Sequence, residues 1–337
     1  MTLRVGISGY GLAGRYFHAP VLKAAGFEVV GVLTKNEERR AQALADFPIT
    51  SVVGTMPELL DLGLDLLVIA SANPAHASDA IAGLRRKVPV VIDKPMGRNV
   101  AETKEIIAVA NEMGTIVSTY FNRLFDSDAL TVKKVLAEGV LGEVFRLDSR
   151  FERFRPTPNP ASWREANSAV DGGGNLLDLG PHLVSLALNW FGPAQVTYSS
   201  VRSIRGLSDD DIVINLKHDS GVDSYLSASA IIGSDGPRIR LSGTKGSLVI
   251  KDLDSQEPRL RAGEYPKGGG WTPPAITPAF IHRGEEVIPY AGEPGNYSLF
   301  YSKVAEAISG TGSWPVTSDD ALAVAEILDQ ARVRSIR

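Results

Sequence analysis

The sequence predicts an α/β protein with two domains. The N-terminal domain has a parallel sheet covered by helices, and the C-terminal domain is α+β, with a large open, mostly antiparallel sheet. Three observations predict this. Strand and helix patterns alternate up to Tyr120, strand patterns predominate from Glu143, and a glycine-rich turn separates the first strand from the first helix. Alternating strands and helices favour a parallel sheet, whereas runs of strands joined by turns favour an antiparallel one. A chain of 337 residues is long enough for two cores, which we expect at residues 1–122 and 123–337.

The composition is that of a globular protein, and it excludes several classes of function. Hydrophobic residues make up 44% of the chain, charged residues 22%, and the formal net charge is −4. A mildly acidic chain is not attracted to nucleic acid or to an anionic membrane, so we expect neither as a partner. The chain has no cysteine, which excludes disulfides, thiolate catalysis and cysteine-ligated metals. We predict no metal site, no membrane-spanning run and no targeting leader, and we expect a cytoplasmic protein.

The first strand, with apolar residues at Leu3, Val5 and Ile7, leads into a turn that matches G-x-G-x-x-G. Helix-like apolar spacing follows over 15–26. Such a turn between a strand and a helix lets a pyrophosphate approach the N–H groups at the helix N-terminus. A chance match is the alternative, because the chain has 33 glycines. The strand–turn–helix context predicts a dinucleotide-binding Rossmann domain, whose contacts we assign to Gly9, Gly11, Leu12, Ala13 and Gly14.

The other elements follow from β-branched runs, alternation and amphipathic spacing. In the first domain we expect strands at 28–33, 52–53, 65–70, 88–92 and 115–121, and helices at 36–47, 57–61, 75–86 and 100–111. In the second we expect a helix at 126–138, strands at 143–154, 195–203, 212–217, 222–230, 238–242 and 247–251, and helices at 297–309 and 318–334. The stretch 261–278, with Gly268-Gly269-Gly270, is the expected flexible excursion. A sheet with one uncovered face often packs on a second subunit, so we expect a homo-oligomer.

The end of the second strand indicates which cofactor is bound. Thr34 lies where an acidic residue would bind the adenosine ribose of NAD, and Lys35, Arg39 and Arg40 follow it. A hydroxyl and basic side chains suit a 2′-phosphate, so NADP is favoured over NAD. The alternative is that the three basic residues form a solvated face.

Two loops after later strands carry further candidate residues. Cofactors dock at the carboxyl ends of strands in open α/β sheets, so we assign Ser71, Asn73 and His76 to the nicotinamide side of the cofactor site. Lys94 follows Asp93 after the next strand. An ammonium there can polarise a carbonyl or stabilise an alkoxide during hydride transfer. Taken singly, a helix cap, a surface histidine and a surface ion pair explain these residues as well.

A fourth candidate lies in the second domain, after Gly172-Gly173-Gly174. If the chain is helical from Asn175, Asp178 and His182 stand at i and i+4 on one face. A carboxylate beside an imidazole fixes its tautomer and keeps its pKa near neutrality, as a general acid/base needs. Pro181 is costly inside a helix, so the helix either starts later or kinks there. A surface pair is the alternative.

Together these motifs resemble the Gfo/Idh/MocA family of glucose–fructose oxidoreductases and inositol dehydrogenases. The resemblance extends over nearly the whole chain and is carried by the glycine turn, Asp93-Lys94-Pro95, Trp163-Arg164, Gly172-Gly173-Gly174 and Asp178-Leu179-Gly180-Pro181-His182. It implies a Rossmann domain, and a C-terminal sheet that mediates homodimers or homotetramers.

The resemblance also implies site residues. Lys94, Asp178 and His182 would form the catalytic group, and Trp163 and Arg164 would contact the cofactor. The chain departs from the family pattern in two places. Asp93 replaces the commoner glutamate, and Ser185 stands where many relatives have aspartate, so substrate assignments do not carry over.

We therefore predict an NAD(P)-dependent oxidoreductase that moves hydride between nicotinamide and a carbon bearing a hydroxyl or carbonyl on a sugar or polyol. In oxidation His182 takes the hydroxyl proton and Lys94 stabilises the alkoxide, while Asp178 orients His182 or binds a neighbouring hydroxyl. We also assign Asn122 to the cofactor site and predict that the substrate pocket is walled by residues for which core or surface packing is the alternative, namely Arg123, Phe151, Arg153 and Tyr297. Two rival functions stay open, a redox-assisted glycosidase that recycles its cofactor and a non-enzymatic dinucleotide-sensing regulator.

Overall fold

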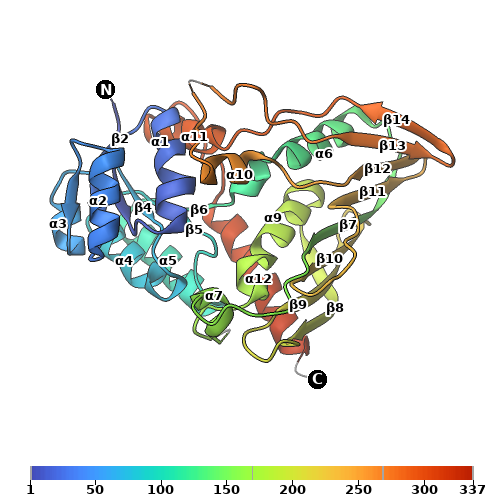
Figure 1. Ribbon diagram of the computed structural model, residues 1–337, viewed down its shortest axis with the longest axis horizontal. Coiled ribbons are helices and arrows are strands. Elements are labelled where there is room, and N and C mark those ends of the chain that lie inside the picture. The colour runs from blue at the N-terminus through green and yellow to red at the C-terminus, as the bar shows by residue number, and fades with distance from the viewer. Residues whose placement is uncertain (1, 169, 268, 336–337) are drawn as a thin grey trace. The chain divides into compact units, whose positions relative to one another are not determined.

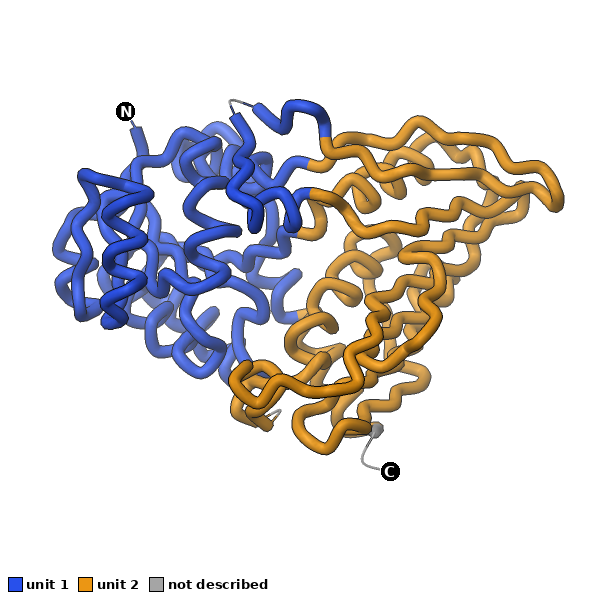
Figure 2. The backbone as a smooth tube through the Cα atoms, in the orientation of Figure 1, with its two compact units in different colours: residues 1–122, 256–274, 296–322 blue, residues 123–255, 275–295, 323–337 orange. Residues whose placement is uncertain are grey.

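The computed structural model describes residues 2–168, 170–267 and 269–335, so Gly268 of the expected excursion lies outside the described residues (Figure 1). Contacts divide the chain into two compact units, which Figure 2 distinguishes by colour. The first comprises Met1–Asn122, Gln256–Pro274 and Asn296–Leu322, and the second comprises Arg123–Ser255, Ala275–Gly295 and Ala323–Arg337. The sequence predicts two continuous domains, and the return of two later segments to the first unit is a difference. Local patterns report local structure, and they do not show which of two cores a late segment joins.

A six-stranded parallel sheet forms the centre of the first unit, in the order β3-β2-β1-β4-β5-β6. Its strands are β1 (Arg4–Ser8), β2 (Glu28–Leu33), β3 (Ser51–Val53), β4 (Leu66–Ile69), β5 (Val90–Asp93) and β6 (Val117–Tyr120). Every residue of β4 is buried, as a strand covered on both faces requires. The predicted parallel sheet is confirmed. The strand order reverses between β1 and β4, and ligands of such sheets bind at the carboxyl ends beside that point.

Most helices of the first unit follow the predicted ranges closely, but the first differs and α10 lies where the sequence predicts no helix. They include α2 (Glu37–Asp46), α3 (Met56–Leu60), the 3-10 helix η2 (Asn73–Ala75), α4 (His76–Arg85), α5 (Val100–Met113), α10 (Gln256–Arg261) and α11 (Ser298–Ile308). The predicted helix over 15–26 is instead a π-helix, η1 (Ala13–His18), followed by α1 (Ala19–Ala24). Pro20 lies in the first turn of α1. Its missing N–H interrupts the α-helical hydrogen-bond pattern, which accounts for the change.

An eight-stranded sheet forms the second unit, in the order β14-β13-β12-β11-β7-β10-β9-β8. Its strands are β7 (Val144–Glu152), β8 (Ala194–Arg202), β9 (Asp211–His218), β10 (Asp223–Ser229), β11 (Ile239–Gly243), β12 (Gly246–Ile250), β13 (Ala279–Arg283) and β14 (Glu286–Tyr290). All neighbours are antiparallel except β7 and β10, so the predicted mostly antiparallel sheet is confirmed. The sequence does not predict β13 and β14, a short hairpin at the sheet edge. Pro289 in β14 obscures the strand pattern, and proline is tolerated in edge strands.

The second unit contains α6 (Ser127–Glu138), α7 (Trp163–Ala166), α8 (Asn175–Asp178) and α9 (Gly180–Phe191), while the 3-10 helix η3 (Asn122–Phe125) and α12 (Ser318–Ser335) include residues of both units. α9 packs against β7 and β10. Along β7, Leu147 and Phe151 are buried, whereas Arg146 and Arg150 are partly exposed. Side chains of a strand alternate between the two faces of its sheet. One face of this sheet is therefore apolar and covered by α9, and the opposite face carries charges.

Candidate active site

The glycine turn after β1 is too closely packed to hold side chains. Gly9 has a φ of +92°, and a Cβ there would lie 2.7 Å from the backbone nitrogen of Ser71. A Cβ at Gly14 would overlap the carbonyl oxygen of Gly9. Glycine adopts such φ values without strain and allows this close approach of backbones. The chain can therefore pass directly from β1 into η1.

The residues assigned to the pyrophosphate lie at this turn together with Arg39. η1 begins at Ala13, and the N–H of Arg15 donates to the carbonyl oxygen of Gly11 at 2.9 Å. The guanidinium carbon of Arg39 lies 3.7 Å from the position that a Cβ of Gly11 would take. Backbone N–H groups at the start of a helix lack intrahelical partners and bind anions. A turn without side chains at Gly9, Gly11 and Gly14, a helix start and a guanidinium fit a phosphorylated dinucleotide.

The end of β2 presents one buried hydroxyl and two exposed cations. Thr34 is buried, and its Oγ1 accepts a backbone N–H two residues further on at 3.3 Å. Lys35 and Arg39 are exposed, and no hydrogen bond or ion pair within the described residues engages their side chains. Arg40 instead donates to the carbonyl oxygen of Val52 at 3.2 Å. Lys35 and Arg39 are therefore available to a ligand, whereas the side chain of Arg40 stabilises the fold through its bond to Val52.

His76 fastens the loop after β4 to the loop after β5. It is 1% exposed, with Nδ1 2.8 Å from the carbonyl oxygen of Pro95 and Nε2 3.1 Å from that of Ser71. Burial lowers its pKa, although the charge of Asp93 and the two carbonyl groups act in the opposite sense. A neutral imidazole has one N–H, so one of these contacts is a hydrogen bond and the other a close approach. The ring therefore contacts two loops, and its assignment to the nicotinamide side of the cofactor site stays a prediction.

The other two residues assigned in this loop are also held from within the unit. The hydroxyl of Ser71 donates to Oδ2 of Asp79 at 3.1 Å, and Ser8 donates to the same oxygen at 2.8 Å. Asn73 starts η2 and is 7% exposed. The loop is therefore rigidly supported by polar contacts beneath it.

Lys94 directly follows β5, whose last residue is Asp93. Oδ1 of Asp93 accepts the backbone N–H of Lys94 at 3.0 Å and lies 3.8 Å from Nε2 of His18. Burial acts to raise the pKa of Asp93, but the contact with His18 and the charge of Lys94 outweigh burial and lower it. An ionised carboxylate thus lies beside Lys94.

In the second unit, α7 and α8 bring Arg164 and Asp178 together. Nε of Arg164 lies 3.3 Å from Oδ1 of Asp178, and the side chains are 32% and 30% exposed. The guanidinium of Arg164 also lies 4.5 Å from the centre of the Trp163 ring. Three residues assigned from the sequence thus form one cluster, and a polar ligand can reach its guanidinium.

The chain between α8 and α9 resolves the two alternatives for Pro181. α8 ends at Asp178, and α9 begins at Gly180 with Pro181 in its first turn. Asp178 and His182 therefore lie on successive helices, so the condition for a shared face, one unbroken helix from Asn175, is not met, and a helix that starts later is observed. Proline is favoured at the first turn because it lacks the N–H that a continuous helix would need.

His182 lies beside Phe151, one of the residues assigned to the substrate pocket. It is 5% exposed, and its ring centre is 6.1 Å from that of Phe151. The guanidinium groups of Arg238 and Arg123 lie 3.9 Å and 5.2 Å from the Phe151 centre, and Arg123 pairs with Asp126 at 3.0 Å. Phe151 and Arg123 are themselves 2% and 5% exposed. Phe151 packs against the histidine from the core, and the assignment of Phe151 and Arg123 to the substrate pocket stays a prediction.

The remaining assigned residues differ in burial. Asn122 in η3 and Arg153 after β7 are half-buried. Tyr297 is 1% exposed, and its backbone N–H donates to Oε1 of Gln256 at 2.8 Å. Tyr297 therefore belongs to the core of the first unit, as its packing alternative predicts.

The sequence analysis does not predict two polar residues of the structure, the fully buried His18 and the half-buried Asp209. His18 at the end of η1 is fully buried beside Asp93. Asp209 precedes β9, accepts the backbone N–H of Leu176 at 2.7 Å, and has its pKa raised by burial to about 6. The only sequence signals are a polar residue within an apolar helical run for His18 and a run of three aspartates for Asp209.

Comparison with known proteins identifies the family. Residues 3–121 match the oxidoreductase family with an NAD-binding Rossmann fold, and residues 129–249 match the GFO/IDH/MocA C-terminal domain. The chain belongs to the GFO/IDH/MocA family. It is therefore an NAD(P)-binding oxidoreductase, and the family resemblance of the motifs is confirmed.

Three relatives match this GFO/IDH/MocA oxidoreductase over almost its whole length. The uncharacterized oxidoreductase YdgJ of Escherichia coli is 33% identical over 97% of this chain and 95% of its own. The Bacillus subtilis scyllo-inositol 2-dehydrogenase (NADP(+)) IolW is 31% identical over 98% of this chain and 93% of its own. The solved YPO2259 structure from Yersinia pestis is 32% identical, with a TM-score of 0.88 over 99% of this chain and 95% of that chain.

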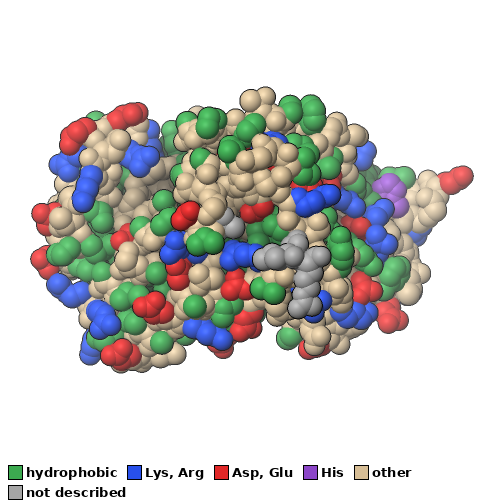
Figure 3. All heavy atoms as spheres, turned by 90° about the horizontal axis from the view of Figure 1, so that it is seen from below, with side chains coloured by type: hydrophobic (Ala, Val, Ile, Leu, Met, Phe, Trp, Pro, Cys, Tyr) green, Lys and Arg blue, Asp and Glu red, His purple; other side chains and the backbone are tan. Residues whose placement is uncertain are grey.

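The surface of this GFO/IDH/MocA oxidoreductase carries both signs of charge. Acidic and basic side chains are interspersed over the face that Figure 3 shows. A uniformly basic stripe is the usual footprint of nucleic-acid binding, and that face has none. Within residues 2–168, 170–267 and 269–335, no helix is both long and apolar enough to cross a membrane.

Proposed function

We propose that this protein transfers hydride between NADP and a sugar or polyol carbon that bears a hydroxyl or carbonyl group. The observation that carries the proposal is the place of Lys94, which follows an ionised carboxylate at the carboxyl end of β5 in an NAD-binding Rossmann unit. Ligands of open α/β sheets bind at this edge. The Bacillus subtilis relative is named as an NADP-dependent inositol dehydrogenase, and this similarity supports a polyol substrate.

The preference for NADP rests on the end of β2. A carboxylate that would bind a ribose hydroxyl is replaced there by the buried Thr34, and the exposed cations Lys35 and Arg39 follow. Arg39 lies beside the glycine turn, where the adenosine phosphate of a bound cofactor would be. Two cations that no other described residue engages suit a 2′-phosphate, which carries negative charge that NAD lacks.

Each proposed catalytic residue has its own part. When bound, the nicotinamide supplies or accepts the hydride. The ammonium of Lys94 stabilises negative charge that develops on the substrate oxygen. His182 takes the hydroxyl proton in oxidation and returns it in reduction. Asp178, whose Oδ1 is shared with Arg164, orients His182 or binds a neighbouring substrate hydroxyl.

Substitution of Lys94 tests the proposed function. Purified enzyme is incubated with NADP⁺ and a panel of inositols, aldoses and alditols, and NADPH absorbance is followed. We expect Lys94→Ala and His182→Ala each to lower kcat by about 10²–10³-fold, because each removes a group that acts in the transition state. Lys104→Ala, an exposed lysine on α5, is the matched control and should turn over at the wild-type rate.

Three results would contradict the proposed function. One is turnover by Lys94→Ala within a few-fold of the wild type. A second is cleavage of a chromogenic glycoside with no net change in NADPH, which would identify a redox-assisted glycosidase. A third is tight binding of NADP without turnover of any sugar or polyol, which would favour a sensor.

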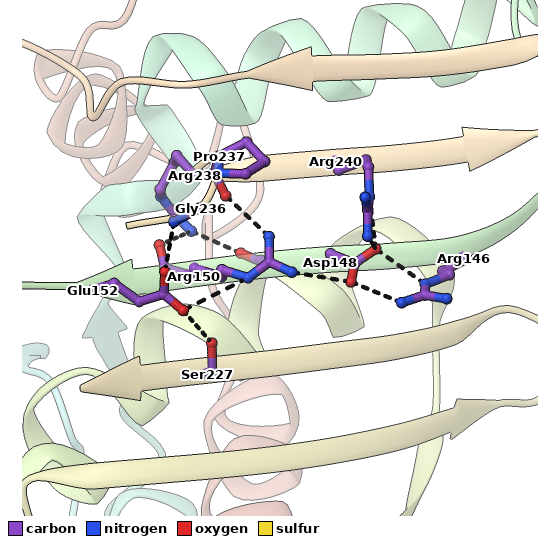
Figure 4. A network of polar contacts seen from close by, with 10 residues as sticks. Arg146, Asp148, Arg150, Glu152, Ser227, Gly236, Pro237, Arg238 and Arg240 are labelled. Atoms are coloured by element: carbon purple, nitrogen blue, oxygen red, sulfur yellow. Dashed lines mark hydrogen bonds and ion pairs between the residues drawn. The ribbon is translucent and has the colours of Figure 1, made fainter. Parts of the chain in front are cut away.

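We also propose that the protein is a homodimer or homotetramer that packs through the charged face of the eight-stranded sheet. Figure 4 shows Asp148 at its centre, with Arg146, Arg150 and Arg240 around it. Burial acts to raise the pKa of Asp148, but hydrogen bonds from Arg146 and Arg240 outweigh it and keep the carboxylate ionised. The guanidinium of Arg146 also stacks on the half-exposed Tyr225, at 4.4 Å. Arginine and tyrosine are enriched in the cores of interfaces.

Light scattering tests this assembly. We expect a dimer or tetramer for the wild type and a monomer for Tyr225→Lys, because a further buried cation beside Arg146 would oppose association. Tyr265→Lys, at an exposed tyrosine of the first unit, is the control and should keep the wild-type mass. A monomeric wild type would contradict the proposed assembly.

A further inference from the structure

His18 is a buried histidine that touches the neighbour of the proposed catalytic lysine. It ends η1, the helix that leaves the glycine turn, and its side chain is 0% exposed. Nδ1 lies 2.6 Å from the hydroxyl oxygen of Tyr301, and Nε2 lies 3.8 Å from Oδ1 of Asp93. The ring also packs on Tyr120 of β6, with ring centres 4.5 Å apart. All four residues belong to the first unit.

Tyr301 determines which nitrogen of His18 carries the proton. Tyr301 is fully buried on α11 and stacks on Tyr120, with ring centres 5.3 Å apart. Burial raises the pKa of Tyr301 far above its ordinary value, so its hydroxyl keeps a proton that it can donate to Nδ1. The opposite tautomer would aim the Nε2 lone pair at the ionised Asp93. In this arrangement the ring presents its Nε2–H to the carboxylate.

Asp93 connects this pair to Lys94. Its Oδ1 accepts the backbone N–H of Lys94 at 3.0 Å and faces Nε2 of His18 at 3.8 Å. The second distance is longer than a hydrogen bond, so this contact is electrostatic. Within the described part of the chain, Nε2 of His18 has no hydrogen-bond partner. The imidazole N–H is thus aimed at one carboxylate, and that carboxylate holds the lysine amide.

We propose that His18 is a positioning residue for Lys94. Held by Tyr301, its Nε2–H keeps the Asp93 carboxylate turned towards the Lys94 amide, which fixes the first residue after β5. The side chain of Asp93 is 16% exposed, so without His18 it would turn towards solvent and release that amide. Lys94 is catalytic only under the function proposed above, so the inference rests on that function.

The first test is spectroscopic and needs no substrate. In protein labelled with ¹⁵N-histidine, long-range proton–nitrogen spectra show which ring nitrogen is protonated. His18 is identified among the five histidines by the signal that His18→Gln loses. We expect a proton on Nε2 of His18 and, in Tyr301→Phe, loss of that single tautomer. A His18 protonated only on Nδ1, or unaffected by Tyr301→Phe, would overturn the inference.

The second test separates positioning from folding. With a panel substrate and NADP⁺, His18→Leu should lower kcat by about 10–100-fold, as displacement of a catalytic group does. KM and the Kd for NADPH, followed by its fluorescence, should stay within about 3-fold. His18→Gln, whose amide N–H can reach towards Asp93, should recover most of the lost kcat.

A matched control exists in the second unit. The ring of His218 is also buried, with Nδ1 2.9 Å from the carbonyl oxygen of Gly192 and Nε2 2.9 Å from the hydroxyl of Ser224. His218→Leu removes a buried imidazole with similar bonds but no link to Lys94, and it should keep the wild-type kcat. An equal loss of kcat in both leucine variants would overturn the positioning role.

The outcomes also separate this inference from the proposed function. If Lys94→Ala loses turnover and a folded His18→Leu does not, the positioning role is overturned and the function stands. If Lys94→Ala keeps turnover, the function itself is overturned, whatever the tautomer of His18. Where His18→Leu does not fold, a wild-type kcat in Tyr301→Phe with a lost tautomer overturns the positioning role.

Discussion

The carboxyl edge of the first unit's sheet and segment 172–182 of the second unit hold their polar side chains differently. At the edge, His76 joins two loops through buried contacts, and Asp93 binds the Lys94 amide. In segment 172–182, Asp178 ends a four-residue helix and pairs with Arg164, and both side chains are partly exposed. Exposed ion pairs typically contribute about 0–1 kcal/mol to stability.

The comparison shows that the backbone of the edge and the backbone of segment 172–182 are held in place by different kinds of contact. Residues at the edge follow strands whose neighbours are hydrogen-bonded on both sides, so their backbone has little freedom. Segment 172–182 is held by a glycine run, two successive helices and side chains that solvent reaches. We therefore expect substitutions at the edge to weaken cofactor binding and stability, and substitutions in the segment to change stability little.

The largest expected effect is a loss of cofactor affinity, caused by a substitution in the glycine turn at the edge. Gly14→Ala places a Cβ on the carbonyl oxygen of Gly9 and must push the turn apart. We expect the Kd for NADPH to rise by more than about 100-fold, equivalent to about 3 kcal/mol. Gly54→Ala is the control, because a Cβ there would meet only a carboxylate oxygen of Glu58 at 3.9 Å. Wild-type affinity in Gly14→Ala, measured by fluorescence titration, would contradict the assignment of this turn.

The next effect sharpens the comparison by removing a buried charge beneath segment 172–182. Burial raises the pKa of Asp209 to about 6, so the folded protein binds this proton more tightly than the unfolded chain does. Stability present at low pH is therefore lost as the pH rises from about 4 through 6. In the wild type, Oδ1 of Asp209 accepts the backbone N–H of Leu176 at 2.7 Å. Asp209→Asn keeps a side-chain oxygen that can accept the same N–H.

Urea unfolding at several pH values measures this prediction. We expect Asp209→Asn to be more stable than the wild type by about 2 kcal/mol at pH 8 and equally stable near pH 4. Asp235→Asn, at an exposed aspartate, should match the wild type throughout. A difference that did not depend on pH would contradict the raised pKa.

A smaller effect tests cofactor choice at the edge. Lys35→Ala and Arg39→Ala should each raise the Kd for NADPH by about 10-fold, or about 1.4 kcal/mol, because each removes a charge from the proposed 2′-phosphate site. Affinity for NADH should not change. Arg85→Ala, an exposed arginine of α4, is the control. Equal losses for NADPH and NADH would place these cations away from the 2′-phosphate.

The smallest expected change in stability lies in segment 172–182. Arg164→Ala breaks a partly exposed ion pair, so the free energy of unfolding should fall by less than about 1 kcal/mol. His76→Gln at the edge disturbs a buried ring and should cost about 2 kcal/mol. Urea unfolding compares the two. A loss in Arg164→Ala equal to that in His76→Gln would remove the contrast between the two regions.

The sequence predicts the edge better than the segment for a physical reason. Strands covered on both faces leave continuous β-branched runs, and the glycine turn has a fixed place after the first of them. Lys94 could therefore be placed at a strand end from local pattern alone. The turn of the chain at Pro181 could not, because a proline permits either a kink or a new helix and the surrounding packing decides between them.

Contacts between distant residues were out of reach of the sequence. The pairing of His18 with Tyr301 joins residues 283 positions apart, and no local pattern reports it. The sequence predicts that His76 is a surface histidine or contacts the cofactor. In the structure it is buried, and its ring contacts the carbonyl groups of Pro95 and Ser71 in two different loops. The sequence therefore predicts the position of a residue that follows a strand or a glycine turn. It does not predict contacts between residues far apart in the chain.

Net hydride transfer tests the central claim most directly. The enzyme is mixed with NADP⁺ and polyols deuterated at the hydroxyl-bearing carbon, and the NADPH and the oxidised product are quantified by mass spectrometry. We expect equal amounts of the two, with the deuterium on the nicotinamide ring, and a loss of both in Lys94→Ala. Binding of NADP with no labelled NADPH from any polyol or sugar, or glycoside cleavage without net NADPH, would contradict the account.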